Sequence, residues 1–122
     1  MNQSSLQQVY ASYLNAYGDI AADERERLIR QSVTNDVISI NPEGESHGID
    51  DLIKHIEQFQ EQNPGAHFKS NKLIAHHGQF LSEWTMYGQD GSAVATAHTY
   101  GRSTEQGFIS YLIGFFERAD KR

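Results

Sequence analysis

The stretch VISINPEGESHGIDDLIKHIEQF, residues 37–59, contains two different hydrophobic periods with a turn between them. Residues 37–41 alternate around two isoleucines, as a half-buried strand does, and the Pro-Glu-Gly sequence at residues 42–44 ends that strand in a turn. From Ile49 onward the apolar side chains recur every three or four residues, which predicts a helix that ends at the Asn-Pro-Gly sequence of residues 63–65. This segment therefore predicts a strand, a turn and an amphipathic helix in that order.

Two helices are expected before this segment. Ser4 and Ser5 are each followed three residues later by a glutamine, which is typical of a helix N-cap, and a helical stripe of apolar residues then runs to about Gly18. A second helix is expected over the charged sequence ADERERLIRQSV at residues 22–33, where the few apolar residues predict a short and mostly solvated element.

After Gly65 the hydrophobic period changes from helical to alternating. Four strands are expected, at residues 66–76, 79–88, 93–102 and 107–117. Glycine-rich turns separate these strands as hairpins. Because the helices come first and the strands follow as a meander, the predicted class is α+β, as a single domain over residues 1–122.

Composition excludes several kinds of partner. The chain carries 16 acidic and 10 basic residues, a formal charge of −6, so nucleic acid and anionic membrane surfaces are not expected to bind it. It has no cysteine, which removes disulfides and thiolate metal sites and fits a reducing compartment. No apolar run approaches the roughly 20 residues of a membrane span, and the N-terminus lacks the features of a signal peptide. We therefore expect a cytoplasmic protein.

The order of these elements resembles the SnoaL-like family, part of the nuclear transport factor 2-like (NTF2-like) superfamily. The resemblance rests on Asn41-Pro42-Glu43-Gly44, on His47-Gly48-Ile49-Asp50-Asp51-Leu52, on Trp84, on the Gln89-Asp90-Gly91 hairpin and on Gly114-Phe115-Phe116. It implies a cone-shaped, cystatin-like fold in which three N-terminal helices pack into a curved antiparallel sheet around a small-molecule pocket, and it implies a homodimer. The group includes polyketide cyclases, steroid isomerases, dehydratases, epoxide hydrolases and proteins without known catalysis, so the fold alone does not identify the chemistry.

The resemblance also implies three candidate catalytic residues. Asn41 stands where steroid isomerases carry a proton-transferring carboxylate; its amide cannot accept that proton but can bind a ligand oxygen, or it simply caps the turn. His98 falls near the position where relatives carry an inward acidic residue, and histidine can exchange a proton near neutral pH, or serve as a hydrogen-bonded residue of the sheet. Tyr10 matches a tyrosine that donates to a developing oxyanion, although tyrosines at helical spacing are also typical of core packing.

Further side chains are expected to line the same pocket and make it apolar and aromatic. These candidates are Tyr13, Ser39, His55, Phe59, Trp84, Tyr100 and Phe115. His55 lies at the edge of the apolar stripe of its helix, where it guards the pocket mouth or faces solvent. The alternative for the whole set is that these side chains fill the cone.

No metal site is expected, because the histidines lack the spacing of paired ligands, and no cofactor site is expected, because the sequence has no glycine-rich phosphate loop. His76 and His77 are adjacent on a predicted strand, so their rings are expected to point to opposite faces. Three functions remain open: an enzyme that moves a proton on a small, mostly apolar, oxygenated molecule, a non-catalytic binder of such a ligand, or a dimeric interaction domain with a filled pocket. The first predicts that Asn41, His98 and Tyr10 converge on one cavity.

Overall fold

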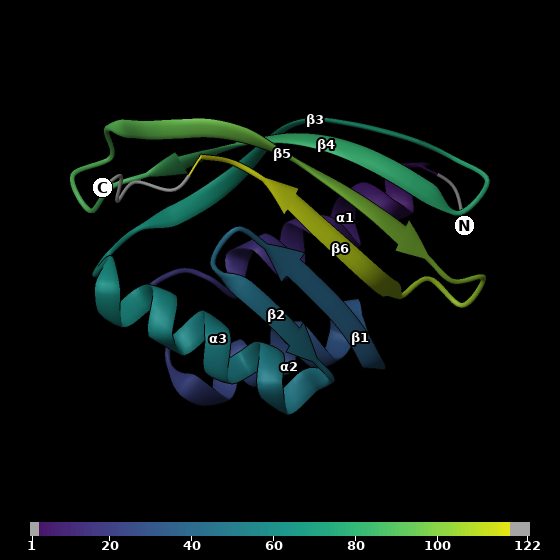
Figure 1. Ribbon diagram of the computed structural model, residues 1–122, viewed down its shortest axis with the longest axis horizontal. Helices are drawn as coiled ribbons and strands as arrows, with labels where there is room; N and C mark the ends of the chain where they lie inside the picture. The colour runs from purple at the N-terminus through teal and green to yellow at the C-terminus, as the bar shows by residue number, and fades with distance from the viewer. Residues whose placement is uncertain (1–2, 118–122) are drawn as a thin grey trace.

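A computed structural model of the protein describes residues 3–117, with side chains from Ser5 onward, as three helices against one six-stranded sheet (Figure 1). The elements in chain order are α1 (Gln3–Asn15), α2 (Ala22–Ser32), β1 (Val33–Asn41), β2 (Gly44–His47), α3 (Ile49–Gln62), β3 (His67–His76), β4 (Gln79–Tyr87), β5 (Ala93–Ser103) and β6 (Ile109–Phe115). The three expected helices and the four expected C-terminal strands are confirmed, and so is the α+β class.

The strand order in the sheet is β2-β1-β6-β5-β4-β3. Neighbouring strands are antiparallel, with one exception: β1 and β6 run parallel. The short strand β2 was not expected, because its four residues are too few to show an alternating pattern. It is defined by its pairing with β1, in which Ser39 lies opposite Ser46 and Asn41 lies opposite Gly44.

Strand β1 begins at Val33, four residues earlier than the sequence predicted, because α2 ends directly in extended backbone. The hydroxyl of Ser32 donates to the carbonyl oxygens of Leu28 and Ile29, at 2.8 and 3.2 Å, and so binds acceptors in the last turn of the helix. Val33 then takes φ −124° and ψ 160°, a conformation that suits its β-branched side chain.

Helix α2 is tied to α1 by a buried arginine. The Nε and Nη2 atoms of Arg25 donate to the carbonyl oxygens of Ala16 and Gly18, at 2.9 and 2.7 Å. These carbonyls follow the end of α1, where the helix itself offers no donors. The prediction that this helix is mostly solvated is therefore wrong at Arg25, which is 6% exposed.

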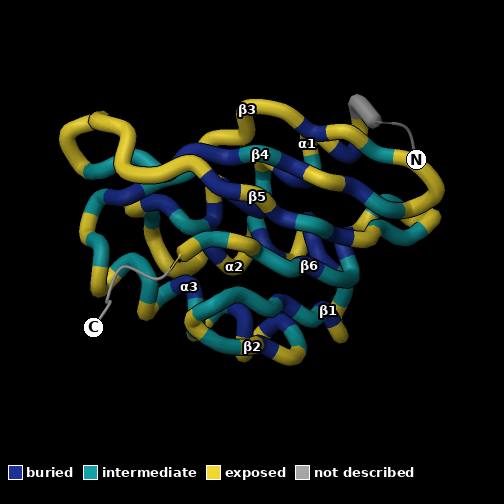
Figure 2. Tube along the Cα trace, turned by 45° about the horizontal axis from the view of Figure 1, so that its top comes forward, coloured by how far each residue is buried: buried dark blue, intermediate teal, exposed yellow. Residues whose placement is uncertain are grey.

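The hydrophobic core lies between the helices and the inner face of the sheet, over which the long strands β3, β4 and β5 arch (Figure 1). In one row across the sheet, Phe80 lies beside Gly101, and Gly101 beside Leu112. The Phe80 ring occupies the space above the glycine, because a Cβ on Gly101 would lie 2.2 Å from the Phe80 Cζ. Buried residues recur at every second position over much of β4 and over the second half of β5, where Figure 2 shows dark blue segments alternating with lighter ones. Among the described helices, none is long and apolar enough to span a membrane.

Candidate functional site

A chain of buried hydroxyl groups runs along the inner face of the sheet beneath α1. Ser82 donates to the phenol oxygen of Tyr10 at 2.6 Å, and the hydroxyl of Thr99 lies within hydrogen-bonding reach of the same phenol. The indole Nε1 of Trp84 donates to Thr99 at 2.9 Å. All four side chains are at least nine-tenths buried. Two strands and one helix thus hold a polar network inside an otherwise apolar core.

A second pair of tyrosines extends this network toward β1. The phenol oxygens of Tyr13 and Tyr17 are 2.8 Å apart, and Ser39 is within hydrogen-bonding reach of Tyr13. Burial raises the pKa of Tyr13 well above its usual value and raises the pKa of Tyr17 to about 12. Burial also raises the pKa of Tyr10. These phenols therefore stay protonated at physiological pH and keep a proton to donate.

Aromatic rings continue from Tyr17 across the interior to the end of β6. Tyr17, Phe59 and Phe68 form a mutual cluster with ring centroids 5.2–5.7 Å apart. Phe68 meets Trp84 edge-on at 5.1 Å, and Trp84 contacts Phe116 at 6.1 Å. The expected interior positions of Phe59 and Trp84 fit this arrangement. The interior is therefore aromatic with a set of hydroxyl donors, which suits an apolar molecule carrying oxygen atoms.

Strands β1 and β2 form the wall next to α3. Asn41 accepts a hydrogen bond from the backbone N–H of Glu43 at 2.8 Å, the turn-capping role that was one of its two expected readings. Its side chain also borders the interior, since a Cβ on Gly114 would lie 3.5 Å from the Asn41 Cβ and 3.8 Å from the Thr99 hydroxyl oxygen. His55 is half-buried on α3, and its Nδ1 lies 3.2 Å from the hydroxyl of the buried Ser46.

Three residues expected in the pocket lie on the outer face of the sheet instead. His98 has a side chain 54% exposed, with its Nε2 3.8 Å from a Glu83 carboxylate oxygen. Tyr100 also turns outward and donates to the Oε1 of Gln79 at 2.6 Å, and Phe115 is 58% exposed. The expected convergence of Asn41, His98 and Tyr10 is therefore wrong.

The outward positions of His98 and Tyr100 follow from the register of β4 against β5. Trp84 faces the interior and pairs with Ala97, so Ala97 and Thr99 share its face and His98 must point the opposite way. Phe116 takes the inner position expected for Phe115. Sequence reasoning missed Thr99 and Phe116. Side-chain size could have identified the inner face of β5, because its small residues Ala97 and Gly101 lie opposite the large inward rings of Trp84 and Phe80 on β4.

No carboxylate is buried within the described part of the chain, where the buried polar side chains are Arg25, Ser32, Ser39, Ser46, Ser82, Thr85 and Thr99. Residues 3–117 also hold no group of three or more His, Asp or Glu positioned for a metal ion. One expectation about the histidines is wrong. His77 adopts φ 53° in the β3–β4 turn, which brings its Nδ1 within 3.0 Å of the His76 Nδ1.

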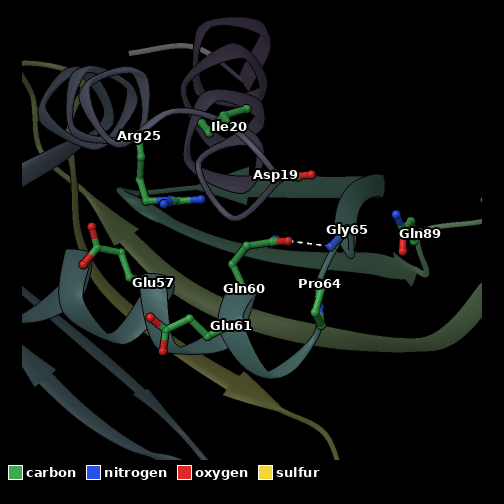
Figure 3. A pocket seen from close by; sticks show the side chains of 9 residues that line it. All are labelled: Asp19, Ile20, Arg25, Glu57, Gln60, Glu61, Pro64, Gly65 and Gln89. Atoms are coloured by element: carbon green, nitrogen blue, oxygen red, sulfur yellow. Dashed lines mark hydrogen bonds between the residues drawn. The ribbon is translucent and has the colours of Figure 1, made fainter.

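A separate, open cleft of about 590 Å³ lies where the α1–α2 connection meets the end of α3 (Figure 3). Its lining residues are Asp19, Ile20, Arg25, Glu57, Gln60, Glu61, Pro64, Gly65 and Gln89. Two of its polar groups already serve the backbone: Arg25 binds the end of α1, and Gln60 binds the carbonyls of Tyr17 and Ala66 and the N–H of Gly65. None of the predicted site residues lines this cleft; Tyr10, Tyr13 and Trp84 are buried in the interior instead.

Solved structures share this arrangement of helices and strands over nearly the whole chain. A candidate isomerase of the SnoaL-like family from Agrobacterium tumefaciens strain C58 superposes with a TM-score of 0.85 at 20% identity, over 95% of this chain and 100% of that chain. The protein has the SnoaL-like, or NTF2-like, fold.

Two other structures with the NTF2-like fold are similar. A candidate SnoaL-like polyketide cyclase from Jannaschia sp. CCS1 has a TM-score of 0.74 at 15% identity, over 92% of this chain and 85% of that chain. An NTF2-like protein of unknown function from Exiguobacterium sp. 255-15 has a TM-score of 0.70 at 16% identity, over 87% of this chain and 95% of that chain. No protein-family model matches the chain, and no curated protein does. The likeness therefore concerns the fold.

Proposed function

We propose that the interior of the cone binds a small, mostly apolar, oxygenated molecule, on which the protein acts as an isomerase- or cyclase-type enzyme by moving a proton. The observation that carries this proposal is the buried hydroxyl network of Tyr10, Ser82, Thr99 and Tyr13 among aromatic rings. Neutral donors of this kind bind a carbonyl or hydroxyl oxygen and stabilise negative charge that develops on it. The candidate isomerase and cyclase of the same fold support the same general kind of chemistry.

A non-catalytic binding module is the second candidate, and Asn41 favours it. An amide at the position of the carboxylate cannot transfer a proton, and the Oδ1 of Asn41 is already occupied by the turn. Both candidates require ligand binding in the interior, and only the first requires chemical turnover.

Trp84 provides the test, because it is the single tryptophan of the chain and lies in the interior. Its fluorescence is followed while a panel of naphthols, nitrophenols and cyclic ketones is titrated into the protein. We expect saturable changes for some members of this panel. Gly114→Leu places a side chain between Asn41, Phe116 and Thr99, and is expected to weaken binding about tenfold or more.

The matched control is Ile113→Phe, because the side chain of the neighbouring residue points to the opposite face of β6. This variant should bind as the wild type does. Saturable binding that Gly114→Leu leaves unchanged would place the ligand elsewhere, and a complete lack of binding across the panel would refute the proposed function.

A further inference from the structure

The buried serine pair Ser39 and Ser46 connects two parts of the interior that are distant in sequence. The two residues lie directly opposite each other in the β1–β2 ladder, and both are buried. Opposite residues of an antiparallel pair point to the same face, with Cβ atoms about 4.5–5.5 Å apart. Ser39 reaches the phenol of Tyr13, while Ser46 binds the Nδ1 of His55. The imidazole and the tyrosine hydroxyls therefore approach one region of the interior from two sides.

The position of Asn41 supports this placement of His55. Asn41 is paired with Gly44, and a Cβ on Gly44 would lie 3.7 Å from the Cε1 of His55. The imidazole of His55 thus packs against Gly44, opposite Asn41, on the inner face of strands β1 and β2. The Nδ1 of His55 is held by Ser46, and its Nε2 has no hydrogen-bond partner among the described residues. Thr34 Oγ1 is the buried side-chain polar atom without a partner in this part of the chain, so the Nε2 of His55 is not closed off from solvent and stays accessible to a ligand.

Two carboxylates on the elements that carry or face His55 are engaged with His47. On β2, Glu45 lies 2.9 Å from the His47 Nε2, and on α3 the carboxylate of Asp51 accepts the backbone N–H of His47 at 2.9 Å. Within residues 3–117, the histidines with a carboxylate oxygen inside 4 Å are His47 and His98. His55 is thus left with a neutral hydroxyl partner.

We infer that His55 is the proton-accepting residue of this interior, with Ser46 as its positioning residue, and that the ligand carries an acidic hydroxyl or enol. This inference rests on the proposed function. The Nδ1–H donates to Ser46, which leaves the Nε2 lone pair free. A ligand O–H transfers its proton to Nε2, giving an imidazolium and an oxyanion, and the protonated phenols of the hydroxyl network donate to that oxyanion.

The probe is 4-nitrophenol, whose phenol and phenolate forms absorb differently, so that the ionisation of the bound molecule is read directly. A neighbouring cation favours the ionised form of an acid by roughly 1–3 pKa units. We expect the bound probe to be half ionised at lower pH than the free probe. His55→Gln should raise that pH by at least about one unit, a tenfold change, with little effect on binding of the neutral probe. Ser46→Ala should give a smaller shift in the same direction.

His98→Gln is the matched control, because it removes an exposed imidazole from the outer face and should leave the bound probe unchanged. Circular dichroism checks that each variant is folded, and His55→Asn replaces His55→Gln if the latter is not. An unchanged ionisation of the bound probe in the His55 variants would overturn the inference and leave the proposed function standing. If no nitrophenol or naphthol binds, the inference is overturned, whereas the proposed function fails only if the cyclic ketones also do not bind.

Discussion

Replacing Tyr10 by phenylalanine should change how the stability of the protein depends on alkaline pH. Tyr10 is 1% exposed, and burial raises its pKa well above the usual value of about 10. Above pH of about 10 the unfolded chain loses the tyrosine proton while the folded chain keeps it. The folded state then binds more protons than the unfolded state, so the free energy of unfolding falls as pH rises.

The size of this effect follows from the number of buried phenols. Each buried phenol lowers the free energy of unfolding by about 1.4 kcal/mol per pH unit above pH ~10, until it loses its proton in the folded state as well. Tyr13 and Tyr17 have pKa values shifted in the same direction, and Tyr17 titrates in the folded state at about 12. Together the three give a slope of about 4 kcal/mol per pH unit between pH ~10 and ~12. Tyr10→Phe should reduce this slope by about a third.

Urea unfolding followed by Trp84 fluorescence at a series of pH values measures this slope. At neutral pH the variant is also expected to lose about 1–3 kcal/mol, because the buried hydroxyl of Ser82 loses its acceptor. The double variant Tyr10→Phe, Ser82→Ala removes both partners, so it should recover much of that loss and retain the shallower slope. Tyr87→Phe, on the outer face, controls for the loss of a phenol as such. An alkaline slope in Tyr10→Phe equal to that of the wild type would refute the reasoning.

Two further predictions concern the sheet. Gly101→Ala should cost about 1–3 kcal/mol or more in urea unfolding, because its Cβ would lie 2.2 Å from the Phe80 Cζ and 2.9 Å from the Tyr111 carbonyl oxygen. Gly114→Ala, whose Cβ meets its neighbours at 3.5 Å or more, is the control, and equal costs would contradict the packing argument. The homodimer implied by the resemblance stays a prediction. Leu81 lies on the outer face of the sheet, which also exposes Ile74 and Phe115, so Leu81→Glu should convert the dimer to a monomer in analytical ultracentrifugation. The control variant Asp90→Lys, in the β4–β5 turn, should leave the dimer intact. A wild type that is monomeric at every concentration would rule the dimer out.

The secondary structure could largely be predicted from the sequence, because each helix and long strand shows its burial pattern locally. Helix α3 has apolar residues at helical spacing, and buried residues alternate with more exposed ones over much of β4 and the second half of β5. Strand β2 could not be predicted in this way, since four residues carry too little pattern and the strand depends on its pairing with β1. The parallel pairing of β1 with β6 joins residues 73 to 76 positions apart in the sequence, and no local pattern predicts it.

For the candidate site, the sequence by itself determined which residues share a face, and the tertiary structure decided which face is inside. Alternation separates His98 from Ala97 equally well whichever of them points inward. The inward choice follows from Trp84, which pairs with Ala97 and fills the interior above small residues. The contact between His55 and Ser46 likewise needs α3 to fold back over β2. A strand has two faces of equal local geometry, and only packing against the helices makes one of them the interior.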